Sequence, residues 1–166
     1  MLRNMTAIFI ECRGKILLLE RIGSRVFDEP AWVGIGGHFE PEELNDPRHC
    51  VLRELWEETG IREEDLSDIC LKYIVLRQKK EEIRQNYYFF AKLKNSEWVL
   101  PECREGNLAW VTVRELPHKR LPLSTRACLA HYLHGGKEDK RVYVGVGTNG
   151  ENGADVRITP LMDYED

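Results

Sequence analysis

Long apolar runs are absent from this chain of 166 residues, and no stretch is long enough to span a bilayer. The first segment, MLRNMTAIFIECRGK, has one short apolar run, which Glu11 and Arg13 break. Such a run is shorter than the hydrophobic region of a secretory signal peptide. We therefore expect a cytoplasmic protein that has no membrane partner.

Paired cysteine motifs are also missing. The five cysteines are odd in number, scattered along the chain and never spaced as CxxC. This pattern argues against a disulfide framework and against a zinc site, and it predicts reduced thiols. The cysteines are Cys12, Cys50, Cys70, Cys103 and Cys128.

The chain has no excess of positive charge. It carries 24 Lys and Arg residues against 28 Asp and Glu residues, which gives a formal net charge of −4. Nucleic-acid duplexes and acidic membranes select basic surfaces, so neither is expected as the main partner. A small phosphorylated ligand remains compatible with the composition, because a metal ion could neutralise its charge.

Internal repeats, low-complexity tracts and linkers are absent as well, and a hydrophobic content of 42% is ordinary for a globular protein. A length of 166 residues suits one domain with its own core. We expect a single α+β domain over residues 1–166, in which a strand-containing tail begins at about residue 138.

Runs of apolar and β-branched residues predict the strands. TAIFIE and KILLLERI would form a hairpin across CRGK, and CLKYIVLRQKK would pair with IRQNYYFFAKLK across Glu81 and Glu82. A further strand is expected at NLAWVTVREL, and one or two more in the tail, where turn-forming Asn-Gly pairs occupy 149–150 and 152–153. A helix is predicted over 124–134, with Ser124 as its N-cap and Gly135 as its stop.

An earlier helix should begin at Asp46-Pro47 and stop at Gly60. Asp is a favoured N-cap, Pro suits the first helical position, and Gly is a common C-terminal signal. Val51 and Leu55 belong to an apolar stripe at helical spacing, which would face the core.

The same helix carries three carboxylates in the stretch RELWEETGI. At about 100° per residue, Glu54, Glu57 and Glu58 fall within an arc of about 100°, so they share one face. Hard divalent cations take oxygen ligands, and Mg²⁺ usually shares a few carboxylates with substrate phosphates. The spacing therefore makes a metal site possible. The alternative is a solvated helix face on which Arg53 pairs with Glu57.

The context of these acids resembles the Nudix box of the Nudix hydrolases. Residues 34–61, GIGGHFEPEELNDPRHCVLRELWEETGI, contain a double Gly, an acid-rich loop, a helix start and the pattern Arg-Glu-aliphatic-any-Glu-Glu-any-Gly-aliphatic. Every fixed position of that pattern is matched. Two extra residues precede Arg53, which leaves the family's loop glutamate at Glu42 or Glu43, and we favour Glu43.

The resemblance implies a Nudix fold, which is an α/β/α sandwich around a mixed sheet that carries the loop-helix-loop of the box. It also implies hydrolysis of a nucleoside diphosphate linked to another moiety, by water attack on phosphorus with the help of Mg²⁺ or Mn²⁺. Arg53 would orient a glutamate through a charge-assisted bond. The implied metal ligands are the carbonyl of Gly37 and the carboxylates of Glu54, Glu57 and Glu58.

The resemblance leaves the general base open, because family members use either a box glutamate or a carboxylate from a distant loop. Glu105, which precedes Gly106 and a Trp-containing strand, is the preferred loop candidate. Glu102 is the second choice. The alternative is that both are solvated loop acids.

The stretch AWVGIGG is similar to W-N-G-F-G-G of oxidised-purine nucleoside triphosphatases. This similarity suggests a nucleoside triphosphate, with 8-oxo-dGTP as an example, although Val33 stands where those enzymes read the base with Asn. Trp32, Arg25 and His38 are the predicted substrate-binding residues. Further candidates, for which core packing or ordinary surface charge is the alternative, are Phe27, Tyr87, Tyr88, Phe89, Lys15 and Arg21.

Other substrates and another class of function stay open. ADP-ribose, dinucleoside polyphosphates and NADH are alternative substrates, and a nucleotide-binding module without hydrolysis is the alternative class. Retention of Arg53 and the three box glutamates favours the enzyme, since a pure sensor need not keep them. The expected partners are a small nucleotide and Mg²⁺ or Mn²⁺, with no nucleic acid, in a monomer or a homodimer.

Overall fold

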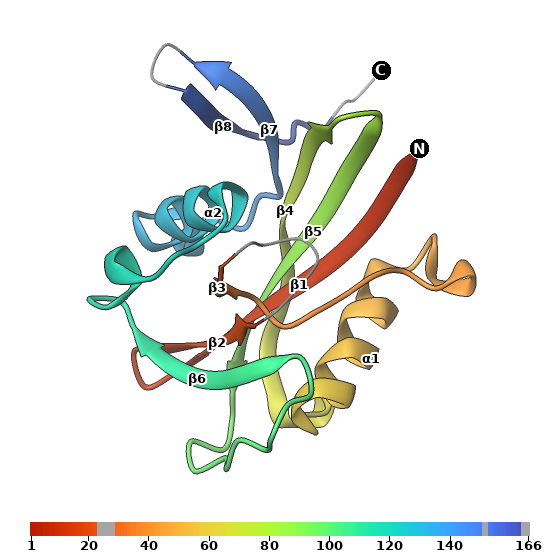
Figure 1. The fold of residues 1–166 in the computed structure, drawn as a ribbon. Coiled ribbons are helices and arrows are strands. Elements are labelled where there is room, and N and C mark those ends of the chain that lie inside the picture. Colours follow the sequence, from red (N-terminus) through yellow and green to blue (C-terminus); the bar gives the residue numbers. More distant parts are fainter. Residues whose placement is uncertain (23–28, 151–152, 164–166) are drawn as a thin grey trace.

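A computed structural model describes residues 1–22, 29–150 and 153–163 of the chain. Its strands join into one mixed sheet, in the order β3-β2-β1-β5-β4-β7-β8, and β6 pairs with β2 (Figure 1). The strands are β1 (Leu2–Cys12), β2 (Lys15–Arg21), β3 (Ala31–Val33), β4 (Leu66–Lys79), β5 (Glu82–Leu93), β6 (Gly106–Thr112), β7 (Tyr143–Gly150) and β8 (Gly153–Pro160). The helices are α1 (Pro47–Thr59), α2 (Leu123–Leu133) and the single 3-10 turns η1 (Pro41–Glu43), η2 (Glu63–Asp65), η3 (Leu116–His118) and η4 (Gly136–Glu138).

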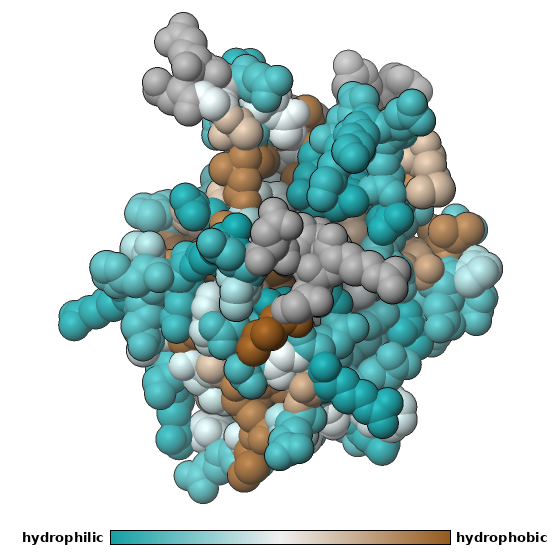
Figure 2. Space-filling model, in the orientation of Figure 1, coloured by the Kyte–Doolittle hydropathy of each residue, from teal (hydrophilic) through white to brown (hydrophobic). Residues whose placement is uncertain are grey.

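The two long helices cover opposite faces of the sheet (Figure 1). Neighbouring side chains of β1 divide between them, since Ile8 packs in the cluster of α1 and Phe9 in the cluster of α2. This alternation is the period of a strand that is buried on both faces. The outside of the molecule, in the same view, is largely hydrophilic (Figure 2). The predicted α/β/α sandwich around a mixed sheet is confirmed.

Both predicted hairpins are present. β1 pairs antiparallel with β2, and β4 pairs antiparallel with β5. The second turn falls at Lys80 and Glu81, so that Glu82 belongs to β5 rather than to the turn. Lys80 takes up a left-handed conformation with φ of 56° to make this tight connection.

The predicted N-cap of the second long helix is wrong. α2 begins at Leu123 after Pro122, and Ser124 lies inside its first turn. The Ser124 side chain is buried, and its Oγ lies 3.0 Å from the hydroxyl of Tyr88 on the sheet. A tertiary hydrogen bond to a buried tyrosine has thus taken the place of a local cap. The helix ends at Leu133, one residue earlier than expected.

The tail forms a hairpin that extends the sheet. β7 runs parallel to β4 and antiparallel to β8. Asn149 and Gly150 belong to the end of β7 and Gly153 begins β8, so the pair at 149–150 is not the turn. Residues 151–152, which connect the strands, lie outside the described residues. No helix in the described ranges is long and apolar enough to cross a membrane. The five cysteines are all free, as expected.

The helix α1 has both ends that its sequence predicts. The Asp46 carboxylate accepts a hydrogen bond from the backbone N–H of His49 at 3.0 Å. At the other end Gly60 is left-handed, with φ of 71°, and its N–H donates to the carbonyl of Trp56 at 2.8 Å. The bounds of the helix that carries the three carboxylates are therefore set locally.

Replacing Gly60 with Ala should lower the free energy of unfolding by about 1 kcal/mol, because an L-residue is strained in the left-handed region. No atom lies within 4 Å of the added Cβ, so strain is the only cost. Asn tolerates this conformation better, and Gly60→Asn should lose less. Urea unfolding measures both variants, and equal losses would contradict this account.

Candidate active site

The double glycine lets the chain run between β1 and α1. The N–H of Thr6 on β1 donates to the carbonyl of Gly37 at 2.9 Å. A Cβ on Gly36, whose φ is 152°, would lie 2.3 Å from the Thr6 carbonyl oxygen. A Cβ on Gly37 would lie 2.5 Å from the carboxylate atoms of Glu54. Only glycines allow the backbone to come this close to a helix carboxylate.

Glu43 ties the preceding loop to the helix. Its carboxylate is 1% exposed and accepts two hydrogen bonds from Arg53, from Nε at 2.8 Å and from an Nη at 2.9 Å. This bidentate pair is the strong form of an Arg–carboxylate contact. The neighbouring Glu42 is exposed. The preferred loop acid, Glu43, is thus the one in contact with Arg53, and the turn η1 takes up the extra residues before Asp46.

Arg53 also bonds to α1 and to the segment that follows the double glycine. One Nη donates to Glu54 at 2.9 Å and lies 3.4 Å from Glu57, and the other donates to the carbonyl of His38 at 3.1 Å. The surrounding carboxylates, Glu43 first, raise the pKa of the Arg53 guanidinium, which is charged at any ordinary pH. The predicted contact between Arg53 and a glutamate is present, and it involves more than one glutamate.

The three carboxylates of α1 differ in exposure. The Glu57 side chain is 49% exposed, whereas that of Glu54 is 15% exposed. Burial raises the pKa of the Glu54 carboxyl. Burial, and then the negative charge of Glu54, raise the pKa of Glu58 to about 7. One oxygen of Glu58 is buried and has no hydrogen-bond partner among the described residues. A buried acceptor without a donor is unusual, and a cation or a proton would satisfy it.

A second loop faces these acids across a cleft of about 730 Å³. β2 pairs with β6 so that Arg21 lies opposite Gly106, and Arg21 forms an ion pair with the adjacent Glu105. The cleft brings both loop candidates, Glu102 and Glu105, to the same space as the helix carboxylates. Its lining residues are Glu54, Trp56, Glu57, Glu58, Thr59, Gly60, Pro101, Glu102, Cys103, Arg104 and Glu105.

The donor set suits a hard divalent cation. Carboxylate and carbonyl oxygens are the ligands that Mg²⁺ and Mn²⁺ prefer, and the unpartnered oxygen of Glu58 supplies one of them. Among the described residues, no three His, Cys, Asp or Glu side chains converge into a ready-made cage. Glu54 and Glu57 are directed toward Arg53 in this structure. Their carboxylates would therefore have to rotate to bind a metal ion. Substrate phosphates and water usually complete such a shell.

The predicted substrate residues are scattered. His38 lines a small cavity beside Gly36 and Gly37, and burial lowers the pKa of its imidazole. Trp32 is half-buried and lies under the Nζ of Lys119, 4.0 Å from the ring centroid. Arg25 and Phe27 lie outside the described residues.

The remaining aromatic and basic candidates lie in the core, on the surface or at the cleft. Tyr88 and Phe89 are buried in the two cores, which bears out the core alternative for them, and Tyr87 is half-buried beside Phe39. Lys15 lies at the opposite end of β2 from Arg21 and is exposed. Arg21, paired with Glu105, is the basic candidate that the structure brings to the cleft.

Three arginines that the sequence analysis did not name as candidates lie near the predicted substrate residues. Arg3, Arg77 and Arg84 line the cavity beside His38 together with Asn86. The alternation of Arg84, Asn86 and Tyr88 in IRQNYYFF predicts that these three share one face of a strand. This alternation can be read from the sequence. The pairing of Arg84 with Arg3 and Arg77 on the neighbouring strands cannot.

Comparison with known proteins gives a family and a fold. A family model described as the NUDIX domain matches residues 2–132. The MutT protein from Bacillus halodurans is 23% identical with a TM-score of 0.67, over 94% of this chain and 97% of that one. A MutT protein from Methanosarcina mazei Go1 is 25% identical with a TM-score of 0.62, over 82% and 96%. An ADP-ribose pyrophosphatase from Streptococcus suis 89-1591 is 14% identical with a TM-score of 0.58, over 87% and 98%.

Removing the Glu43 carboxylate should destabilise the protein in a pH-dependent way. The bond from Arg53 lowers the pKa of Glu43 from its ordinary 4.5 to about 2, which corresponds to about 3 kcal/mol at neutral pH. This stability is complete above the unfolded pKa and is lost as the pH falls through the folded one. Glu43→Gln should therefore lose about 3 kcal/mol at neutral pH, and the difference from wild type should shrink between about pH 5 and pH 2.

Urea unfolding at a series of pH values measures this difference. Glu42→Gln removes the same charge from an exposed neighbour and should change stability by less than about 0.5 kcal/mol. A loss at Glu43 that does not depend on pH would show that the ion pair is not its cause.

Proposed function

The chain belongs to the Nudix family, whose members hydrolyse phosphorus-containing anhydrides, and we propose that it cleaves a diphosphate linkage in a nucleoside triphosphate with a divalent cation. The proposed substrate is a (d)NTP, and 8-oxo-dGTP is the first modified nucleotide to test. The observation that carries the proposal is the cleft in which Glu54, Glu57 and Glu58 meet the second-loop acids. Water attack on phosphorus needs a cation site and a base within reach of one space, and the cleft offers both.

Four groups would hold Mg²⁺, or Mn²⁺ in its place. They are the carboxylates of Glu54, Glu57 and Glu58 and the carbonyl of Gly37, a residue whose Cα side faces the Glu54 carboxylate. Bound there, the ion would neutralise charge on the diphosphate and lower the pKa of a water molecule. Arg53 positions Glu54 through its hydrogen bond and anchors it to the loop through Glu43.

The proton of the attacking water would pass to a carboxylate of the same cleft. Glu105 is our preferred base, and Arg21 holds its carboxylate by an ion pair. Glu102 lines the same cleft and is the alternative loop base. A base must lie within hydrogen-bond reach of the water, so single Glu105→Gln and Glu102→Gln variants separate the two.

Recognition of the base needs residues other than those of oxidised-purine triphosphatases. Val33 offers no side-chain hydrogen bond at the position where those enzymes have Asn. His38 remains our candidate for a substrate contact, because it borders the cavity next to the double glycine. Trp32 keeps one ring face under Lys119, so a nucleobase could stack on it only by displacing that side chain.

A substrate panel with Mg²⁺ tests the proposal. We expect release of phosphate or pyrophosphate, or of a nucleoside monophosphate, from at least one of these: nucleoside triphosphates, 8-oxo-dGTP, ADP-ribose, dinucleoside polyphosphates and NADH. Glu57→Gln should lower that activity at least about a hundredfold, because a lost cation ligand removes several kcal/mol of charge stabilisation.

Glu64→Gln is the matched control, since Glu64 is an exposed carboxylate on η2 that does not line the cleft. It should keep wild-type activity. Full activity of Glu57→Gln would remove the metal-site assignment. Metal binding without turnover of any compound in the panel would favour a binding module.

A further inference from the structure

Three arginines stand in one row across the sheet. Arg3 on β1 is paired with Arg84 on β5, and Arg84 is paired with Arg77 on β4. Directly paired residues on neighbouring strands point to the same face. That face is the one covered by α2, because Phe9 and Phe90 of the same strands pack in its cluster. The row lines a cavity of about 120 Å³.

The charges of this row are not balanced. Glu82 forms an ion pair with Nη2 of Arg3 at 2.7 Å and accepts a hydrogen bond from Nε of Arg84 at 2.5 Å, so one acid serves two guanidinium groups. Arg77 forms no ion pair within the described part of the chain, and its Nε is buried without a hydrogen-bond partner. Like charges directly opposite on a sheet are destabilising, and burying an unpaired charge costs more. The stability of the fold therefore does not explain why these three arginines lie side by side.

The start of α2 adds to the attraction for an anion. Pro122, Ser124 and Thr125 line the same cavity. No side chain caps the first turn of this helix of 11 residues, so its leading N–H groups are left for another acceptor. Helix N-termini and arginine forks are both common binding groups for phosphate.

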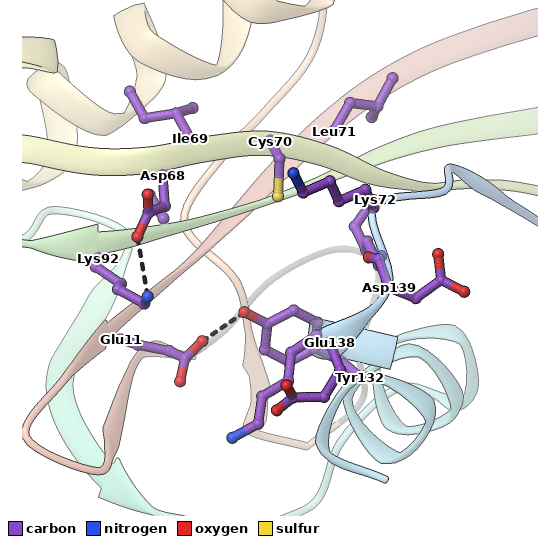
Figure 3. Close-up of a pocket in the computed structure, with 13 residues that line it drawn as sticks. Glu11, Asp68, Ile69, Cys70, Leu71, Lys72, Lys92, Tyr132, Glu138 and Asp139 are labelled. Carbon is purple, nitrogen blue, oxygen red and sulfur yellow. Dashed lines mark hydrogen bonds and ion pairs between the residues drawn. The ribbon is translucent and has the colours of Figure 1, made fainter. Parts of the chain in front are cut away.

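Another hollow in the molecule differs from the arginine row, because its polar side chains have partners. Lys92 pairs with Asp68 at 2.9 Å, and Tyr132 donates to Glu11 at 2.5 Å (Figure 3). The buried Lys72 donates to the backbone carbonyl of Asp139. Each of these groups has a partner within the chain, whereas Arg77 has none among the described residues.

The backbone of the arginine row is displaced along β1 from the double glycine. Thr6, which bonds to the Gly37 carbonyl, is three residues along β1 from Arg3, or about 10 Å at about 3.3 Å per residue. The same cavity nevertheless reaches Gly36, Gly37 and Arg21, which border the carboxylate cleft. One extended ligand could therefore touch both places.

We propose that the arginine row, with Arg77 as its specificity-determining residue, binds a second phosphate of the substrate, on the side of the nucleotide away from the scissile diphosphate. The inference rests on the proposed hydrolysis of a diphosphate linkage, and it favours a dinucleotide that carries a ribose phosphate over a nucleoside triphosphate, which has no phosphate on that side. Arg3 and Arg84 share Glu82 and supply the positive surroundings. Arg77 supplies the donors that no group of the described chain uses.

Binding without metal tests the row independently of hydrolysis. Calorimetry in the presence of a chelator would compare AMP with adenosine 2′,5′-bisphosphate and adenosine 3′,5′-bisphosphate. At least one bisphosphate should bind the wild-type protein at least about tenfold more tightly than AMP, as expected for one charge-assisted bidentate contact. Arg77→Gln should abolish this preference and leave AMP binding unchanged. Equal affinity for all three ligands, or a preference that survives Arg77→Gln, would overturn the inference.

Two further variants control for charge and for folding. Arg126→Gln removes the same charge from an exposed position on α2 and should keep the preference. Arg77→Met should give an apo protein whose Tm is equal to or above that of wild type, because an unpaired buried guanidinium is removed. A Tm several degrees lower would show that Arg77 is structural and would also overturn the inference.

Kinetics with NADH and NADPH then separate this inference from the proposed function. The two differ by one ribose phosphate, and NADPH should have the higher kcat/KM in wild type but not in Arg77→Gln. If hydrolysis of both is absent with Mg²⁺ while the bisphosphate preference holds, hydrolysis of this class fails and the arginine site stands. If both are hydrolysed equally and the bisphosphates bind no better than AMP, the enzyme stands and the arginine site fails.

Discussion

The buried ion pair between Glu43 and Arg53 is the constraint on which the rest of the site depends. It joins a loop to the middle of α1, and its two hydrogen bonds fix both the distance and the angle between them. Because Arg53 also bonds to Glu54 and to the carbonyl of His38, the position of the double glycine follows from the same side chain. Glu54 is thereby held beside Gly37, where an added Cβ would lie 2.5 Å from its carboxylate.

Two concentrations of like charge lie near the segment that the ion pair fixes. The carboxylates of α1 lie on one face of the sheet, and the arginine row lies on the other, which α2 covers. Each group costs stability, through repulsion and through burial of unpartnered atoms such as Glu58 Oε2 and Arg77 Nε. A ligand with a cation at one end and a phosphate at the other would relieve both costs. The proposed substrate, with its bound cation, would thus supply the opposite charge that each of the two groups lacks.

Local signals in the sequence were sufficient for the helix that carries the acids. Asp46 sets its start with a side-chain cap next to Pro47, Gly60 ends it through backbone geometry, and the period of Val51 and Leu55 sets its inner face. The sequence allowed Glu42 or Glu43 as the loop acid and favoured Glu43, and the contact with Arg53 is made by Glu43. The prediction of Ser124 as the N-cap of α2 was wrong because its hydroxyl bonds to Tyr88 on the sheet. Such a tertiary partner cannot be read from neighbours in the sequence.

The arginine row needed more than local signals, because it depends on the register of three strands. Arg77 and Arg84 meet only if β4 and β5 pair around the turn at Lys80 and Glu81, and a slip of one residue would put one of them on the opposite face. Arg3 joins them through a parallel pairing across some 80 residues of sequence. The loss of a hydrogen-bonding group at Val33 and the gain of this row fit one explanation. Recognition through charge, at a site formed by the sheet, would make a base-reading side chain at that position unnecessary.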